Sequence, residues 1–106
     1  MKSFEELEHN VLKWAEETGI LSKGDPKTQT NKLFEEGGEL AGAIIRNDID
    51  KIKDGIGDVA VVLIILSRMY GTDVTLCLED VYKIIDAREG EMVDGAFVKQ
   101  EDLWNR

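Results

Sequence analysis

Four acidic side chains recur at helical spacing in the middle of the chain. Glu36 and Glu39 are three residues apart, and Asp54 and Asp58 are four apart. Residues at these separations share one face of an α-helix, so each pair would border or continue an apolar face. Ionised carboxylates on such a face need a partner, because desolvation costs several kcal/mol. Four oxygen-bearing side chains from two helices would suit Mg²⁺ or Mn²⁺, whereas zinc prefers histidine and cysteine.

The spacing is also compatible with ordinary solvated acids at one end of a helical bundle. Ion pairs with nearby lysines would then satisfy the carboxylates, and the candidates are Lys27, Lys32, Lys51 and Lys53. Acids at helical spacing usually have this simpler explanation. The spacing alone therefore leaves both a metal site and a solvated face open.

Glycines interrupt both acid-bearing segments, at Gly37 and Gly38 and again at Gly55 and Gly57. Each costs ~1 kcal/mol relative to alanine inside a helix. Glycines beside both acid pairs indicate a close approach of two backbones or room for a ligand, although packing alone could explain one or two of them.

The acids must be positioned by helices. Apolar periodicity predicts helices over about 3–18, 26–46, 48–70 and 74–89, followed by an irregular tail or small hairpin over 90–106. The predicted domain is therefore a single one, covering residues 1–106, with an all-α four-helix bundle as its fold.

Local signals support these boundaries. Ser3 and Glu6 have the spacing of a capping box. Asp25 followed by proline suits an N-cap and a first helical turn. Asn47 is expected to end one helix and Asp48 to cap the next.

The third predicted helix carries an uninterrupted apolar run over 59–66. A helix that is apolar all round is one buried all round, which a chain of 106 residues cannot achieve alone. We therefore expect a homodimer or homotetramer whose core is completed by oligomerisation.

Composition limits the partners. The formal net charge of −9 disfavours binding to nucleic acid or to an anionic membrane. A protein this acidic would need a cation to handle phosphates. The longest apolar run is far below the ~20 residues that span a bilayer, so a cytoplasmic protein is expected. The single cysteine, Cys77, excludes an internal disulfide, and its apolar neighbours predict a buried thiol.

Two short segments carry a family resemblance. Residues 32–40 read Lys-Leu-Phe-Glu-Glu-Gly-Gly-Glu-Leu, and residues 54–59 read Asp-Gly-Ile-Gly-Asp-Val. They resemble the MazG-like nucleoside-triphosphate pyrophosphohydrolases, all-α enzymes with Glu-x-x-Glu on one helix and Glu-x-x-Asp on the next. The resemblance extends loosely over residues 14–88. Within the family, the chain is similar to the short, single-domain members of phage or integron type. It implies that Glu36, Glu39 and Asp58 are metal ligands.

The fourth ligand position departs from the family pattern. The pattern expects an acid three residues before Asp58, where Gly55 stands. Asp54 lies one full turn before Asp58 and is expected to act as the fourth ligand in place of the acid missing at Gly55. Glu35 is a further candidate for an outer or second metal, although it lies further round the helix.

The resemblance also implies the reaction, which is Mg²⁺-dependent hydrolysis between the α- and β-phosphates of a nucleoside triphosphate. Glu36 or Glu39 would serve as the catalytic base. The candidate substrate-binding residues are Lys32, Lys83, Arg88 and Trp14. The three cations could contact phosphates or be plain surface charges. The tryptophan could stack on a base or pack in the core.

Three functions fit these patterns. The first is the pyrophosphohydrolase, acting in nucleotide-pool house-cleaning. The second is a nucleotide- or partner-binding helical oligomer that has lost turnover through Gly55. The third is a structural acidic oligomer with solvated acids. Metal binding separates the third from the others, and turnover separates the first from the second.

Overall fold

The computed structural model describes residues 1–104, of which 73% are helical. The prediction of a mainly helical fold is confirmed. The chain forms two compact units, Met1–Thr75 and Leu76–Arg106. The single domain expected over residues 1–106 stays a prediction.

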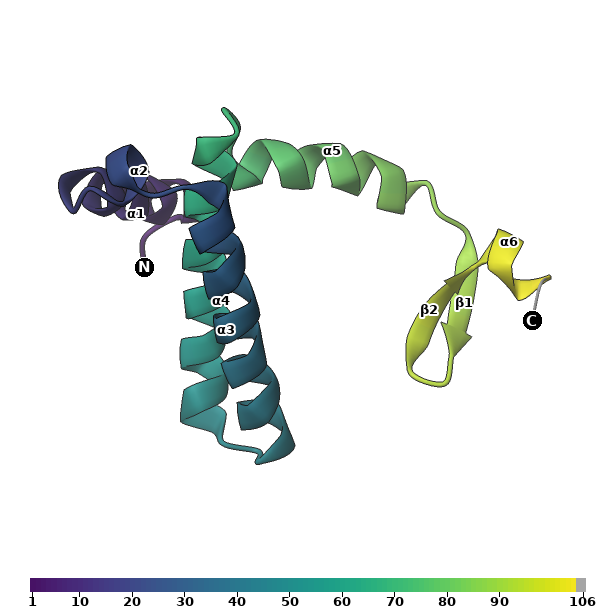
Figure 1. The fold of residues 1–106 in the computed structure, drawn as a ribbon. Helices are drawn as coiled ribbons and strands as arrows, with labels where there is room; N and C mark the ends of the chain where they lie inside the picture. The colour runs from purple at the N-terminus through teal and green to yellow at the C-terminus, as the bar shows by residue number, and fades with distance from the viewer. Residues whose placement is uncertain (105–106) are drawn as a thin grey trace. The chain divides into compact units, whose positions relative to one another are not determined.

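The elements follow the predicted order, with two additions (Figure 1). They are α1 (Phe4–Glu17), α2 (Ile20–Lys23), α3 (Pro26–Ile45), α4 (Ile49–Met69), α5 (Val74–Asp86), β1 (Gly90–Val93), β2 (Ala96–Lys99) and α6 (Gln100–Leu103).

The predicted caps of α1 are present. The Ser3 hydroxyl accepts a hydrogen bond from the Glu6 backbone N–H at 3.1 Å. At the other end, Gly19 adopts a positive φ of 85°, which ends the helix. The short helix α2 follows, where the sequence indicated only a turn-rich connection.

Side-chain caps also define α3 and α4. The Asp25 carboxylate accepts a hydrogen bond from the Thr28 backbone N–H at 2.8 Å, with proline in the first helical turn. Asn47, at a φ of 54°, separates the two helices. The Asp48 carboxylate then accepts from the Lys51 N–H at 3.3 Å and starts α4. These signals produce a helical hairpin in which α3 lies against α4 (Figure 1).

The core of the first unit lies where α1 and α3 pack on α4. Its buried apolar side chains are Leu12, Ala15, Ala43, Val62, Ile64 and Ile65. The expectation that α4 is buried all round is not met within one chain, because Ile56 is 58% exposed and Leu63 is 40% exposed. The four-helix bundle and the oligomer stay predictions.

The second unit contains most of α5, the hairpin and α6. Strands β1 and β2 pair antiparallel, with Val93 opposite Ala96. Asp94 and Gly95 both have positive φ, as a tight two-residue hairpin turn requires. The sequence left an irregular tail or a small hairpin open for this region, and residues 90–99 form a hairpin. The predicted burial of Cys77 is wrong in this chain, where the residue is exposed.

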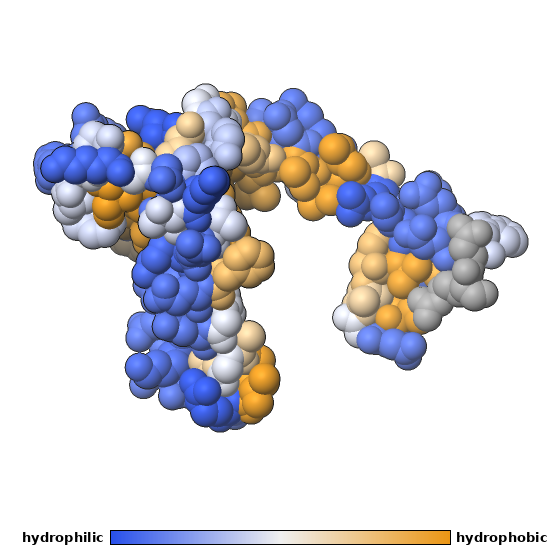
Figure 2. Space-filling view, viewed as in Figure 1, coloured by the Kyte–Doolittle hydropathy of each residue, from blue (hydrophilic) through white to orange (hydrophobic). Residues whose placement is uncertain are grey.

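Apolar side chains gather on the surface of the second unit, along α5 and over the hairpin (Figure 2). On α5 they include Leu78, Val81, Tyr82 and Ile85, all more than two-fifths exposed. This is the apolar face that the sequence predicted for the fourth helix. Within the described unit it remains on the surface.

The length and hydropathy of the helices determine whether one of them could cross a membrane. Among residues 1–104, no single helix is both long and apolar enough to cross a bilayer. Helices α4 and α5 taken together are long and apolar enough, by length and composition only.

Candidate metal centre

Helix α3 supplies two of the four candidate ligands. Glu36 and Glu39 lie one turn apart, and the Glu36 side chain is only 14% exposed. The neighbouring Glu35 side chain is 53% exposed. Among these three glutamates of α3, the partly buried Glu36 therefore loses most water on folding, and Glu35 is largely solvated.

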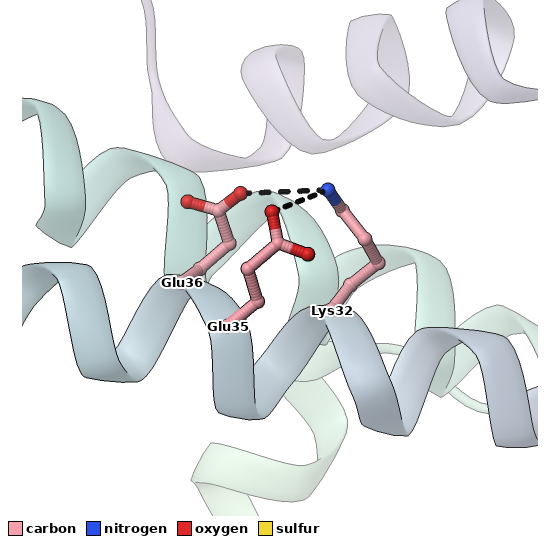
Figure 3. Close-up of polar contacts among 3 residues, drawn as sticks. All are labelled: Lys32, Glu35 and Glu36. Atoms are coloured by element: carbon pink, nitrogen blue, oxygen red, sulfur yellow. Dashed lines mark hydrogen bonds and ion pairs between the residues drawn. The ribbon is translucent and has the colours of Figure 1, made fainter.

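Lys32 engages both neighbouring glutamates one turn further along α3 (Figure 3). Its Nζ lies 3.4 Å from Glu35 Oε1 and 3.6 Å from Glu36 Oε1. The hydrogen bond and charge of Glu35, followed by the charge of Glu36, raise the pKa of the Lys32 ammonium. The alternative of simple ion pairing thus holds in part, because one predicted ligand already has a lysine partner.

Helix α4 supplies Asp54 and Asp58, which lie one turn apart and are both exposed. The acids of α4 still act on those of α3. Desolvation raises the pKa of Glu36, and the negative charges of Glu39 and Asp58 raise it further, while Lys32 opposes the shift. Glu36, Glu39 and Asp58 therefore form one electrostatic group that spans two helices.

The carboxylates of this group lie apart from one another. Within residues 1–104, no three histidine, cysteine, aspartate or glutamate side chains are close enough together to hold a metal ion. The carboxylates would have to close on a cation, and Glu36 would have to leave Lys32.

Gly55 has a packing role that explains its departure from the expected pattern. It is buried, and a Cβ placed on it would lie 3.0 Å from Cβ of Leu40 on α3. A longer side chain there would push the two helices apart. The position that the resemblance assigns to an acid is used here for helix contact.

The other three glycines of this region face open space. A Cβ on Gly37, Gly38 or Gly57 would meet nothing within 4 Å. Close backbone approach therefore applies to Gly55. Room for a ligand beside the remaining three glycines stays a prediction.

A small, mainly apolar hollow lies on one side of Asp58. Its volume is about 150 Å³, and its walls are Trp14, Ile20, Gln29, Lys32, Glu36, Asp58, Val61, Val62 and Ile65. Trp14 is 51% exposed, so it is not a core residue, and about half of its surface is covered by the rest of the chain. Gln29 is buried and was missed by the sequence analysis, although it lies two turns before Glu36 on α3.

A larger, polar hollow of about 440 Å³ lies between α3 and α4 and also reaches Asp58. Its walls are Gly38, Glu39, Gly42, Arg46, Lys51, Asp54, Gly55 and Asp58. Arg46 was not singled out from the sequence, and Lys51 was considered only as a partner for acids. Arg46 is two turns beyond Glu39, and Lys51 is three residues before Asp54, so helical spacing contained the signal.

Lys83 and Arg88 belong to the second unit. Lys83 lies in the last turn of α5. Arg88 lines a hollow of about 450 Å³ within that unit, together with Lys99 and Trp104. Contact of Lys83 or Arg88 with a substrate bound at the acids stays a prediction.

Comparison with known proteins identifies the family. Residues 25–88, more than half of the chain, match the model of the MazG nucleotide pyrophosphohydrolase domain. The chain therefore belongs to this family, and the resemblance read from residues 32–40 and 54–59 is confirmed. Enzymes of the family are typically dependent on a divalent metal.

A phage protein is similar over much of the chain. It is named as the uncharacterized 18.2 kDa protein in the rep-hol intergenic region of Haemophilus phage HP1, strain HP1c1. The two are 38% identical over 76 residues, which are 72% of this chain and 47% of the relative. The chain thus spans about half the length of this curated relative. No solved structure matches the chain.

Proposed function

We propose that the chain hydrolyses nucleoside triphosphates to a nucleoside monophosphate and pyrophosphate with the help of Mg²⁺, or of Mn²⁺ in its place. Membership of the MazG family supports the reaction class. The observation that carries the assignment of the site is electrostatic. Glu39 of α3 and Asp58 of α4 act together on Glu36, which lines the small hollow, and Asp58 lines both hollows.

The donor set fits a hard divalent cation. Glu36, Glu39, Asp54 and Asp58 offer oxygen atoms only, and like charges this close repel one another until a cation joins them. These four side chains would hold the metal. A bound Mg²⁺ would supply positive charge and Lewis acidity at the phosphate oxygens.

The protein's own part in the reaction is to position water and accept a proton. Water oxygen attacks the α-phosphorus, the bond from that phosphorus to the bridging oxygen breaks, and pyrophosphate leaves with the electron pair. One proton of the water passes to a carboxylate of Glu36 or Glu39. Desolvation raises the pKa of Glu36, which favours its carboxylate as a proton acceptor.

The small hollow suits the nucleoside end of the substrate. Trp14 offers half of its surface for stacking, and Gln29 offers an amide beside it. Lys32 lines the same hollow and would move from Glu36 to a phosphate oxygen. Lys83 and Arg88 are retained as further phosphate contacts, to be tested with Lys32.

Self-association to a homodimer or homotetramer is part of this proposal. Phe34 and Ile45 on α3 are 76% and 85% exposed, and Ile56 and Leu63 on α4 are also open. Scattered apolar residues are normal on a surface, but several on one helix pair indicate an interface. Light scattering coupled to size-exclusion chromatography tests this, and a monomeric mass at high protein concentration would contradict it.

A second function rests on Gly55. Because its contact with Leu40 removes one expected acid, a nucleotide-binding protein with weak turnover is the alternative. Such a protein would bind Mg²⁺ and triphosphate without releasing pyrophosphate.

The test is pyrophosphate release from ribo- and deoxynucleoside triphosphates with Mg²⁺, Mn²⁺ or EDTA. We expect metal-dependent formation of monophosphate and pyrophosphate in equal amounts. Glu36→Gln should abolish it, whereas Asp50→Asn should not, since Asp50 lies one turn before Asp54 and lines neither hollow. Triphosphate binding without any product would favour the alternative.

A further inference from the structure

The larger hollow has a separation of charge along its length. Glu39, Asp54 and Asp58 line one part of it, and Arg46 and Lys51 line another. Arg46 follows the last residue of α3, and Lys51 lies in the first turn of α4, so both cations flank the turn that joins these helices. The acids lie further along both helices. A volume of about 440 Å³ falls within the ~300–1,000 Å³ typical of small-molecule sites.

The two cations are not neutralised by the acids that share the hollow. Of the ion pairs formed within residues 1–104, none involves Arg46 or Lys51. Lys32, in contrast, is held by two glutamates within 4 Å. Arg46 and Lys51 therefore remain available to an anion that enters the hollow.

A glycine makes room for the arginine. A Cβ on Gly42, one turn before Arg46, would lie 3.1 Å from the guanidinium Nη1. The guanidinium of this exposed arginine therefore lies beside the backbone of α3, at the wall of the hollow. A planar guanidinium can bind two phosphate oxygens at once.

We propose that Arg46 and Lys51 bind the β- and γ-phosphates of the substrate and hold the leaving pyrophosphate. This inference rests on the proposed function and adds the direction in which the triphosphate lies in the site. The nucleoside lies in the Trp14 hollow, the α-phosphate lies at Asp58, and the remaining phosphates run towards the turn between α3 and α4. Asp58 lines both hollows, as this path requires.

The charge of the protein gives the physical reason for such a site. With a net charge of −9, the chain repels a polyphosphate, and one divalent cation neutralises only part of that ligand. Two unpaired cations beside the acids would offset the remaining charge. They would also stabilise the charge that develops on the bridging oxygen as it leaves.

The experiment is calorimetric titration of the full chain with inorganic pyrophosphate, in Mg²⁺ and in EDTA. The variants are Arg46→Gln, Lys51→Gln and the double substitution. Lys53→Gln is the matched control, because it removes the same charge two residues from Lys51 and lines neither of the two hollows that meet at Asp58. All three positions are exposed, and circular dichroism verifies that the four variants fold.

We expect each substitution to weaken pyrophosphate binding by about tenfold, as the loss of a hydrogen bond to a charged group does. The double variant should weaken it more, while Lys53→Gln and the affinity for nucleoside monophosphate should stay near wild type. Equal losses at Lys53, or unchanged binding in the double variant, would overturn the inference. So would a wild-type chain that binds no pyrophosphate.

Turnover is measured separately, so the two ideas can fail separately. Hydrolysis by wild type with unaltered pyrophosphate binding in the double variant rejects the cation pair and keeps the enzyme. Absence of hydrolysis with Arg46- and Lys51-dependent pyrophosphate binding keeps the anion site and rejects turnover.

Discussion

The two hollows that meet at Asp58 use their cations differently. In the small hollow, Lys32 is bound by acids of its own helix, one turn away. In the larger hollow, Arg46 and Lys51 come from the facing ends of two helices, and neither forms an ion pair within residues 1–104. Spacing alone does not decide which cation is paired, because Lys51 also lies one turn from an acid, Asp54. Lys32 shares its charge with two glutamates, whereas the charges of Arg46 and Lys51 are available to an anion.

The largest effect is expected where the hollows meet. Asp58→Asn should lower kcat/KM for triphosphate hydrolysis by more than about 100-fold, because changes to residues merely supporting a metal ligand already cost 10–100-fold. Steady-state kinetics in saturating Mg²⁺ measure this, with Asp50→Asn as the control. Residual activity close to wild type would remove Asp58 from the site.

A smaller effect should distinguish the two hollows from each other. Trp14→Ala should raise KM about tenfold, since base stacking on an aromatic side chain contributes about 1–3 kcal/mol. Inhibition by pyrophosphate should be unchanged in this variant, whereas Arg46→Gln should weaken it. If Trp14→Ala altered both constants equally, the separate assignment of the hollows would be wrong.

Substitution of Lys32 should have a smaller effect, and it should strengthen Mg²⁺ binding rather than weaken it. Lys32→Met should tighten Mg²⁺ binding in the absence of nucleotide by a few fold, because a pair of charges about 4 Å apart in water interacts by about 1 kcal/mol. The same variant should weaken triphosphate binding. Calorimetry with Mg²⁺ alone measures the change in Mg²⁺ affinity. Lys27→Met serves as the control, because Lys27 forms no ion pair within residues 1–104.

The smallest effect concerns stability and pH. Folding raises the pKa of Glu36 above its ordinary value of 4.5, so the folded chain is penalised for ionising it. The penalty is complete above the raised pKa and disappears as the pH falls below 4.5. In EDTA, Glu36→Gln should therefore raise Tm at pH 7 and lose this advantage near pH 4.

Thermal scans of both proteins at several pH values measure the difference. Asp25 has the opposite behaviour, because the hydrogen bond from the Thr28 backbone lowers its pKa. That contribution is common to both proteins and cancels when Tm values are subtracted. A Tm difference independent of pH would show that Glu36 ionises as freely in the folded chain as in the unfolded one.

Much of the fold was predictable because it depends on short-range signals. Ser3, Asp25 and Asp48 each act on a backbone N–H three residues away, and their caps could be read directly. The placement of the acid pairs on two helices was predictable for the same reason, since one helical turn relates Glu36 to Glu39 and Asp54 to Asp58, while their role as ligands stays a prediction. The MazG resemblance supplied the reaction class, which no spacing contains.

What was missed depends on contacts between elements. The pairing of Gly55 with Leu40 arises only when α3 lies on α4, so the sequence showed a missing acid but not the helix contact that explains it. Arg46 and Lys51 lie on different helices, and only the hollow brings them together. The exposure of Cys77 was missed because apolar neighbours along a helix do not determine whether a second element covers them.

One contact in the first unit has a consequence for the order of folding. The buried Glu8 carboxylate of α1 accepts a hydrogen bond from the Val74 N–H at the start of α5, across 66 residues. Closing so long a loop is entropically costly before α3 and α4 have formed, so this bond should be among the last to form. It should also be among the first to break. Hydrogen exchange at Val74, compared between wild type and Glu8→Gln, would therefore report the earliest local opening of the chain.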